Sequence, residues 1–171
     1  MTTNTPGGVR ILGALRTADG TGIVRLEDRF ATDIDDLWSA VTDPRRLARW
    51  LGEIDGDLRE GGEFRARYFA TGWEGRCRVE VCDRPRRLLI RTTSEEGDGV
   101  VEVTLTADGD HTVLVLEDRG LPPAQLAAYG AGNQVHLEDL AGYLAGRDRC
   151  DARVRWQQLH PGYQQLAVAQ E

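Results

Sequence analysis

Two helical patterns of apolar residues follow one another between Asp33 and Gly52. In the first, apolar side chains recur at spacings of three and four, as in an amphipathic helix; they are Ile34, Leu37, Trp38 and Val41. Thr32 is expected to cap this helix. Pro44 disfavours helical geometry at Asp43 but suits the first position of a second helix, which Asp43 would cap. Two short helices joined at a corner are therefore predicted, the second ending at Gly52 in left-handed geometry.

Each of these helices carries a tryptophan on its apolar face. Trp38 belongs to the first stripe, and Trp50 shares a face with Leu47 and Leu51 in the second helix. The arginines of the second helix fall on the opposite side. We therefore expect both tryptophans to point into the same interior.

Strand patterns flank this helical pair. Upstream, VRILGALR and GIVRLEDRF surround the turn signal TADGT, which predicts a hairpin, or a strand with an extra leading strand, within residues 9–30. Downstream, five more apolar segments are separated by Gly, Asp and Pro; they are EFRARYFA, EGRCRVEVC, RRLLIRTT, VVEVTLTA and HTVLVLED. The order predicts an antiparallel meander with one face covered and one exposed to water.

Helical periodicity returns over residues 122–146, which predicts a long helix that covers the sheet. Gly130 and Gly132 weaken the middle of this helix, so we expect a kink or break near YGAGN. The tail beyond it is predicted to form a short helix, a break before Pro161 and one further helical turn.

Composition limits the kinds of partner. A formal net charge of −7 opposes binding to phosphate backbones or anionic membrane surfaces, so we expect neither nucleic acid nor a membrane as partner. TTNTPGG after Met1 lacks the features of a signal peptide, and no apolar run approaches the ~20 residues of a membrane span. The three cysteines are odd in number, which favours reduced thiols. These features favour a cytoplasmic protein.

Several catalytic chemistries lack the residues that they need. Cys77 and Cys82 have no second pair, and His111, His136 and His160 are scattered, so a metal site is not expected. GAGNQV lacks the lysine and context of a phosphate loop, and no serine stands in a nucleophile-elbow pattern. We therefore expect no cofactor.

The order of the predicted elements resembles the helix-grip fold of the START-related superfamily, also called the SRPBCC or birch-pollen-allergen-like superfamily. LWSAVTDPRRLARWLG, GGEF, RPRRLLI and TVLVLEDRGL resemble, in order, the branch named after the C-terminal domain of the activator of heat-shock protein 90 ATPase. This implies an α+β fold, with a curved antiparallel sheet wrapped around a long C-terminal helix and two short helices after the first main strand. The chain length suits a single domain over residues 1–171, with its core at about 22–146 and a helical extension at 147–171.

The resemblance also implies a function. Such folds hold hydrophobic small molecules in an internal cavity, so we expect a polycyclic aromatic or polyketide-like ligand, bound for sequestration, transport, resistance or assisted cyclisation. Whether the protein is an enzyme stays open; if it is, a cyclase or aromatase without metal or nucleotide is implied. The alternative is a protein-interaction module like the heat-shock protein 90 activator domain. Either a monomer or a homodimer is compatible with the sequence.

The expected ligand-binding residues are aromatic, polar and apolar side chains on the predicted inner faces: Trp38, Trp50, Phe64, Tyr68, Trp73, Tyr129, Asn133, His136, Leu137 and Leu140. No catalytic residue is assigned. A lone histidine such as His136 is more often a satisfied core residue than a ligand contact. Asp28 and Asp118 either lie inside the cavity, where the pKa of a carboxyl rises, or near its mouth, solvated or paired with an arginine.

One position departs from the branch, whose members usually carry a Gly-Trp pair in the long helix. Here Gly132 is followed by Asn133. Replacing an indole with an amide either enlarges and polarises the cavity or leaves Asn133 facing water after a slight rotation of the helix. Both alternatives are compatible with the sequence.

Overall fold

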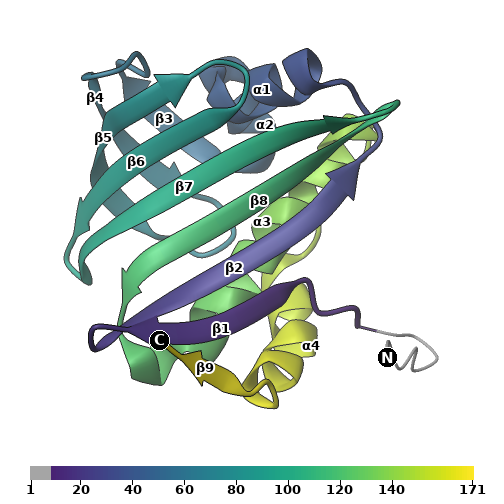
Figure 1. Ribbon diagram of the computed structural model, residues 1–171. Coiled ribbons are helices and arrows are strands. Elements are labelled where there is room, and N and C mark those ends of the chain that lie inside the picture. The colour runs from purple at the N-terminus through teal and green to yellow at the C-terminus, as the bar shows by residue number, and fades with distance from the viewer. Residues whose placement is uncertain (1–8) are drawn as a thin grey trace.

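The computed structural model describes residues 9–171, and within them a single curved sheet of nine strands is wrapped around the longest helix (Figure 1). The strand order is β3-β4-β5-β6-β7-β8-β2-β1-β9. All neighbours are antiparallel except β9, which pairs parallel with β1. The strands are β1 (Gly13–Ala18), β2 (Thr21–Phe30), β3 (Gly52–Gly56), β4 (Glu63–Tyr68), β5 (Glu74–Asp83), β6 (Arg87–Ser94), β7 (Gly97–Asp108), β8 (His111–Leu121) and β9 (Val168–Gln170).

The helices lie on one side of this sheet. They are α1 (Ile34–Thr42), α2 (Pro44–Trp50), the 3₁₀ turn η1 (Pro123–Gln125), α3 (Leu126–Leu144) and α4 (Ala152–Gln164). Helix α3 runs along the covered face of the sheet, and α4 packs against α3 (Figure 1). The predicted α+β helix-grip fold is therefore confirmed. No helix in the described part of the chain is long and apolar enough to cross a membrane, and residues 1–8, on which the absence of a signal peptide was predicted, lie outside that part.

The predicted corner between the two short helices is confirmed, with one correction. Asp43 caps α2 by accepting from the amide of Arg45 at 2.9 Å, and Pro44 takes the first helical position. The cap of α1, however, is Asp33 and not Thr32. Asp33 accepts from the amide of Asp36, whereas the Thr32 hydroxyl donates to the Asp36 carboxylate. An aspartate one residue later offers the same kind of cap with a full charge beside the helix N-terminus.

Gly52 does not end α2 in left-handed geometry, as the sequence predicted. The helix ends at Leu51 in right-handed geometry, and Gly52 begins strand β3. A Cβ at Gly52 would lie 2.2 Å from the carbonyl oxygen of Arg67 on β4. The glycine therefore permits close approach of two strands. The sequence did not predict β3, nor β9, whose three exposed residues pair with β1.

Helix α3 is uninterrupted through Gly130 and Gly132, so a break there is wrong. A Cβ at Gly130 would lie 2.4 Å from Cδ1 of Tyr163, a fully buried side chain on α4. This glycine provides room for a neighbouring ring and does not interrupt the helix. Helix α4 is likewise continuous, with Pro161 inside its last turn, so the predicted break before this residue is also wrong.

The contact at Gly130 leads to a stability prediction. Gly130→Ala is expected to lower the free energy of unfolding by about 1–3 kcal/mol, because the added methyl group forces the Tyr163 ring to move. Gly142→Ala is the matched control in the same helix, since its Cβ would meet nothing closer than 3.8 Å; it is expected to stabilise by up to about 1 kcal/mol. Urea denaturation of both variants measures the difference. Equal stability would contradict the role given to Gly130.

Candidate functional site

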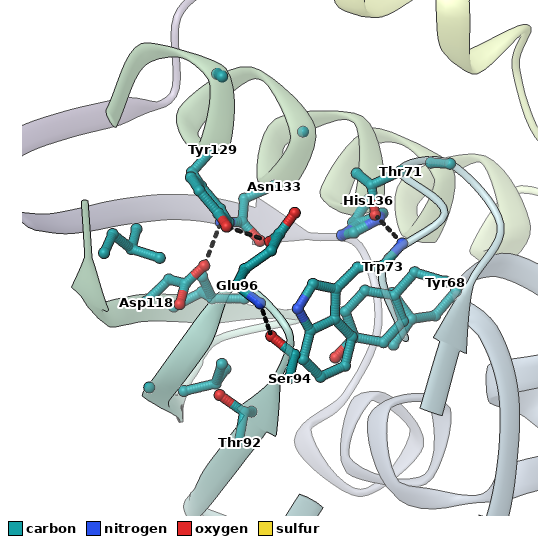
Figure 2. A pocket seen from close by; sticks show the side chains of 18 of the residues that line it. Tyr68, Thr71, Trp73, Thr92, Ser94, Glu96, Asp118, Tyr129, Asn133 and His136 are labelled. Atoms are coloured by element: carbon teal, nitrogen blue, oxygen red, sulfur yellow. Dashed lines mark hydrogen bonds between the residues drawn. The ribbon is translucent and has the colours of Figure 1, made fainter. Parts of the chain in front are cut away.

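A pocket of about 720 Å³ lies between the covered face of the sheet and α3, and we call it the α3 pocket (Figure 2). Its wall is formed by side chains from α2, α3, the loop between β4 and β5, and strands β6, β7 and β8, with further contributions from α4. Most of the wall is apolar and includes Leu47, Leu88, Ile90, Val101, Val103, Leu114 and Leu116. Leu47 comes from α2, and the inward alternation of β6, β7 and β8 places the other six side chains on one face of the sheet.

Aromatic side chains form a second part of the wall. Tyr68 at the end of β4 stacks on Trp73, with ring centroids 5.0 Å apart and planes inclined by 30°. Figure 2 shows this pair beside the turn between β6 and β7. On α3, the Tyr129 hydroxyl donates to the carboxylate of Glu96, which lies in that turn. The contact connects the long helix to the edge of the pocket.

Asp118 and Asn133 form a polar pair in the pocket. The Asn133 amide nitrogen on α3 donates to Oδ2 of Asp118 on β8 at 2.9 Å. Burial raises the pKa of Asp118 to about 6, against the lowering effect of the Asn133 hydrogen bond. Of the two alternatives for Asn133, the structure supports an amide that faces the sheet and polarises the pocket. Asp118 is half-buried and lines the pocket.

Asp28 has a different environment, although it also follows the inward alternation of its strand. Its carboxylate lies 3.9 Å from the Arg10 guanidinium, and Asp28 does not line the α3 pocket. Of the two alternatives for Asp28, the structure therefore agrees with a carboxylate that is paired with an arginine.

His136 is another titratable group of the pocket wall. The residue is 6% exposed, and its ring meets the Tyr68 ring edge-on at a centroid distance of 5.1 Å. Its Nε2 atom has no hydrogen-bond partner among the described residues. Burial lowers the pKa of His136 to about 4, so the imidazole is neutral near pH 7. A neutral imidazole with a free Nε2 can donate or accept one hydrogen bond there, depending on its tautomer.

The sequence model of one protein family, described as Activator of Hsp90 ATPase homolog 1-like protein, matches residues 31–145. The chain belongs to this family. A comparison with curated proteins gives no match.

Solved structures extend this likeness beyond the family match. The crystal structure of CalU16 from Micromonospora echinospora is 30% identical, with a TM-score of 0.76, over 90% of this chain and 94% of CalU16. DynU16, described as a protein of the dynemicin biosynthetic locus, is 31% identical with a TM-score of 0.68 over 75% of this chain and 50% of its own. A protein from Bordetella parapertussis, at 22% identity and a TM-score of 0.70, covers 85% of this chain and 86% of its own, and shows the same fold.

The structure of this family member brings most of the predicted site residues to the α3 pocket. Seven line it: Trp50, Tyr68, Trp73, Tyr129, Asn133, His136 and Leu137. Trp38, Phe64 and Leu140 do not line it, and their side chains are buried in the hydrophobic core. The two tryptophans of the short helices thus differ: Trp50 reaches the pocket and Trp38 packs in the core.

Other wall residues were absent from the sequence prediction. The inward residues of β6, β7 and β8 follow strand alternation, and this signal could have identified Ile90, Val101 and Leu116. Arg153 and Trp156 on α4 also line the pocket. They lie beyond residue 145, where the family match ends. The Trp156 indole donates to the Ala128 carbonyl on α3 at 3.2 Å, a contact that no local pattern indicates.

Proposed function

We propose that this protein binds a hydrophobic, polycyclic small molecule in the α3 pocket. The observation that carries the proposal is a mostly apolar pocket of about 720 Å³ with aromatic walls and few polar groups. Pockets for small molecules commonly enclose ~300–1,000 Å³ and combine apolar walls with a few placed polar groups. Tyr68, Trp73 and Trp50 offer flat surfaces, which favour planar ligands through burial and offset stacking.

A polyketide-like ligand is the chemical class that we favour. DynU16, a protein of the dynemicin biosynthetic locus, supports an association with natural-product chemistry for its relatives. Sequestration, transport, resistance and assisted cyclisation all require binding in such a pocket as their first step. The interaction-module alternative would use the outer face of the sheet and has no need of an open interior, so the pocket favours ligand binding.

Asn133→Trp tests the proposal. The indole would replace an amide that now faces the sheet, and its greater volume is expected to fill the pocket and weaken binding at least 10-fold. Val154→Trp is the matched control, because Val154 is 48% exposed on α4 and an indole there stays outside the pocket. Anthraquinones, flavonoids, steroids and aromatic polyketides would be titrated against each protein by tryptophan fluorescence and thermal shift.

The expected hits quench the fluorescence of the wild type and the Val154→Trp control, and raise their melting temperature by binding the folded state. Circular dichroism is expected to show an intact fold in Asn133→Trp. If no compound distinguishes the wild type from Asn133→Trp, binding in the α3 pocket is refuted and the interaction-module alternative becomes the better one.

A further inference from the structure

Asp118 is a half-buried carboxyl group with hydrogen-bonding capacity that the protein does not use. Within residues 9–171, its side chain accepts one hydrogen bond, from Asn133, and takes part in no ion pair. An ionised carboxylate has about four lone-pair sites. Asp118 lines the α3 pocket, so its remaining acceptor sites are available to an occupant of the pocket.

The surroundings of Asp118 explain why the protein itself does not supply these donors. In the antiparallel sheet, the residues directly opposite Asp118 are Val24 on β2 and Val101 on β7. Cross-strand partners point to the same face, so an apolar side chain stands on each side of the carboxyl group. Helix α3, with Asn133, covers it from above (Figure 2). The open direction is therefore the pocket.

A second free polar atom lies close by along α3. His136 follows Asn133 by three residues, which places both side chains on the same face of the helix, about 5 Å apart along its surface. The Nε2 atom of His136 is buried without a partner. Asn133 contacts Asp118, so this carboxylate and His136 Nε2 offer two unused hydrogen-bonding positions on neighbouring parts of the pocket wall.

We infer that the ligand of the α3 pocket is a hydroxylated polycycle, in which a phenol or enol hydroxyl donates to Asp118 and a nearby carbonyl oxygen accepts from His136 Nε2. This deepens the proposed function and rests on it. Burial of the apolar ligand surface provides most of the affinity, and hydrogen bonds to these two groups make the pocket selective among planar molecules. A site built to pair a hydroxyl discriminates strongly against analogues that lack it, because its buried polar group is then left unpaired.

The proposal predicts that the affinity for hydroxylated ligands and the affinity for ligands without a hydroxyl change with pH in opposite directions. The titratable or charged side chains on the elements around Asp118 are Tyr68, Glu96, Asp98, Tyr129, His136 and the exposed Arg153. The pKa of Asp118 is about 6, so the carboxylate form dominates only above that pH. A ligand hydroxyl stabilises the Asp118 carboxylate by donating a hydrogen bond to it. A ligand without a donor instead displaces the water that would solvate this carboxylate. The affinity for a ligand with a hydroxyl should therefore rise between pH 5 and pH 7.5. The affinity for a ligand without a donor should fall over the same range.

The experiment compares 6-hydroxyflavone with 6-methoxyflavone and flavone, which share the planar skeleton and the carbonyl but differ in the donor. At pH 7.5 the wild type is expected to bind 6-hydroxyflavone at least about 10-fold more tightly than the other two, as for a hydrogen bond to a charged group. Asp118→Asn should reduce this preference to less than about threefold. Glu117→Gln, one residue earlier on the outer face of β8 and paired with Arg16, changes the same charge and should retain the preference.

His136 has a separate readout. All three flavones carry the carbonyl, so His136→Phe is expected to weaken each of them by a similar factor, about fivefold or more, and to leave the preference for the hydroxyl unchanged. Unchanged affinity in His136→Phe would overturn the role of Nε2.

The remaining outcomes separate this inference from the proposed function. Equal binding of the three flavones by the wild type, or a hydroxyl preference that survives in Asp118→Asn, would overturn the inference and leave ligand binding standing. If none of the three binds while other members of the larger panel do, the inference is again refuted. If no compound of either set binds, the proposed function fails and the inference with it.

Discussion

Trp38→Ala is expected to lower the free energy of unfolding by about 3–5 kcal/mol, the range typical of large aromatic side chains removed from cores. Trp38 is 2% exposed and belongs to the main hydrophobic core, where α1 packs against β7 and β8. The indole does not line the α3 pocket, so its loss leaves a new void inside packed protein. Such a void removes dispersion contacts in addition to the transfer free energy of the ring.

Trp73→Ala is the matched control for this prediction. Trp73 is only half-buried, in the loop before β5, where it stacks on Tyr68 at the edge of the α3 pocket. Its removal is expected to reduce stability by only about 1 kcal/mol, which is the usual size of a stacked aromatic pair. Urea denaturation at one pH compares the two variants. A loss below about 1 kcal/mol for Trp38→Ala would place this residue outside the core.

Asp118→Asn is expected to stabilise the protein by up to about 3 kcal/mol at pH 8 and to have little effect below pH 4. The pKa of Asp118 is raised from 3.8 to about 6 by burial, so the folded state binds its proton more tightly than the unfolded state does. The resulting stabilisation is fully present at low pH and is lost as pH rises from about 4 to above 6. A pKa shift of about two units corresponds to about 3 kcal/mol of folding stability. The wild type loses this stability when Asp118 ionises, whereas an uncharged asparagine at the same position does not ionise and keeps it.

His136 has the opposite dependence. Burial lowers its pKa from 6.5 to about 4, so the unfolded state binds the proton more tightly, and stability falls as pH decreases from 6.5 through 4. In the wild type the contributions of Asp118 and His136 oppose each other between pH 4 and pH 6. In Asp118→Asn only the histidine contribution remains, so its stability should rise with pH across this window more steeply than that of the wild type.

The measurement is a series of urea denaturation curves from pH 4 to pH 8 for the wild type, Asp118→Asn and the outer-face control Glu117→Gln. The difference between Asp118→Asn and the wild type isolates the aspartate, because all other titrations are shared. A constant difference over this range would contradict a buried, ionisable Asp118. A similar pH-dependent gain in Glu117→Gln would assign the effect to net charge and not to burial.

Local chemistry was sufficient to predict the corner between α1 and α2. The Asp43 cap and Pro44 act within a few residues of each other, so their effect needs no distant partner. Strand alternation would likewise have identified the inward-facing side chains of β8, since successive side chains point to opposite faces. The inward orientation of Leu114, Leu116 and Asp118, which all line the pocket, follows from this rule. The family motifs lie in these same elements, which is why they identified the fold.

Glycines were interpreted wrongly where their role depends on another element. Gly130 is typical of a weakened helix in the sequence, yet its function is to admit Tyr163, a residue of α4. Gly52 has the position of a helix terminator, yet it is required by the approach of β4. In both positions the missing Cβ matters because of an atom that is distant along the chain. Intrinsic propensity describes only the local part of that free energy.

The sequence by itself determined most of the elements and the family of this protein, because periodicity, caps and turns act over short stretches of chain. Only the tertiary structure decided that Asn133 donates to Asp118, that His136 keeps a free Nε2, that Trp38 belongs to the core while Trp50 reaches the pocket, and that α4 contributes Trp156. These features depend on the rotation of α3 over the sheet and on the docking of α4. Both are set by packing between residues far apart in sequence, where small shifts decide which side chain fills a space.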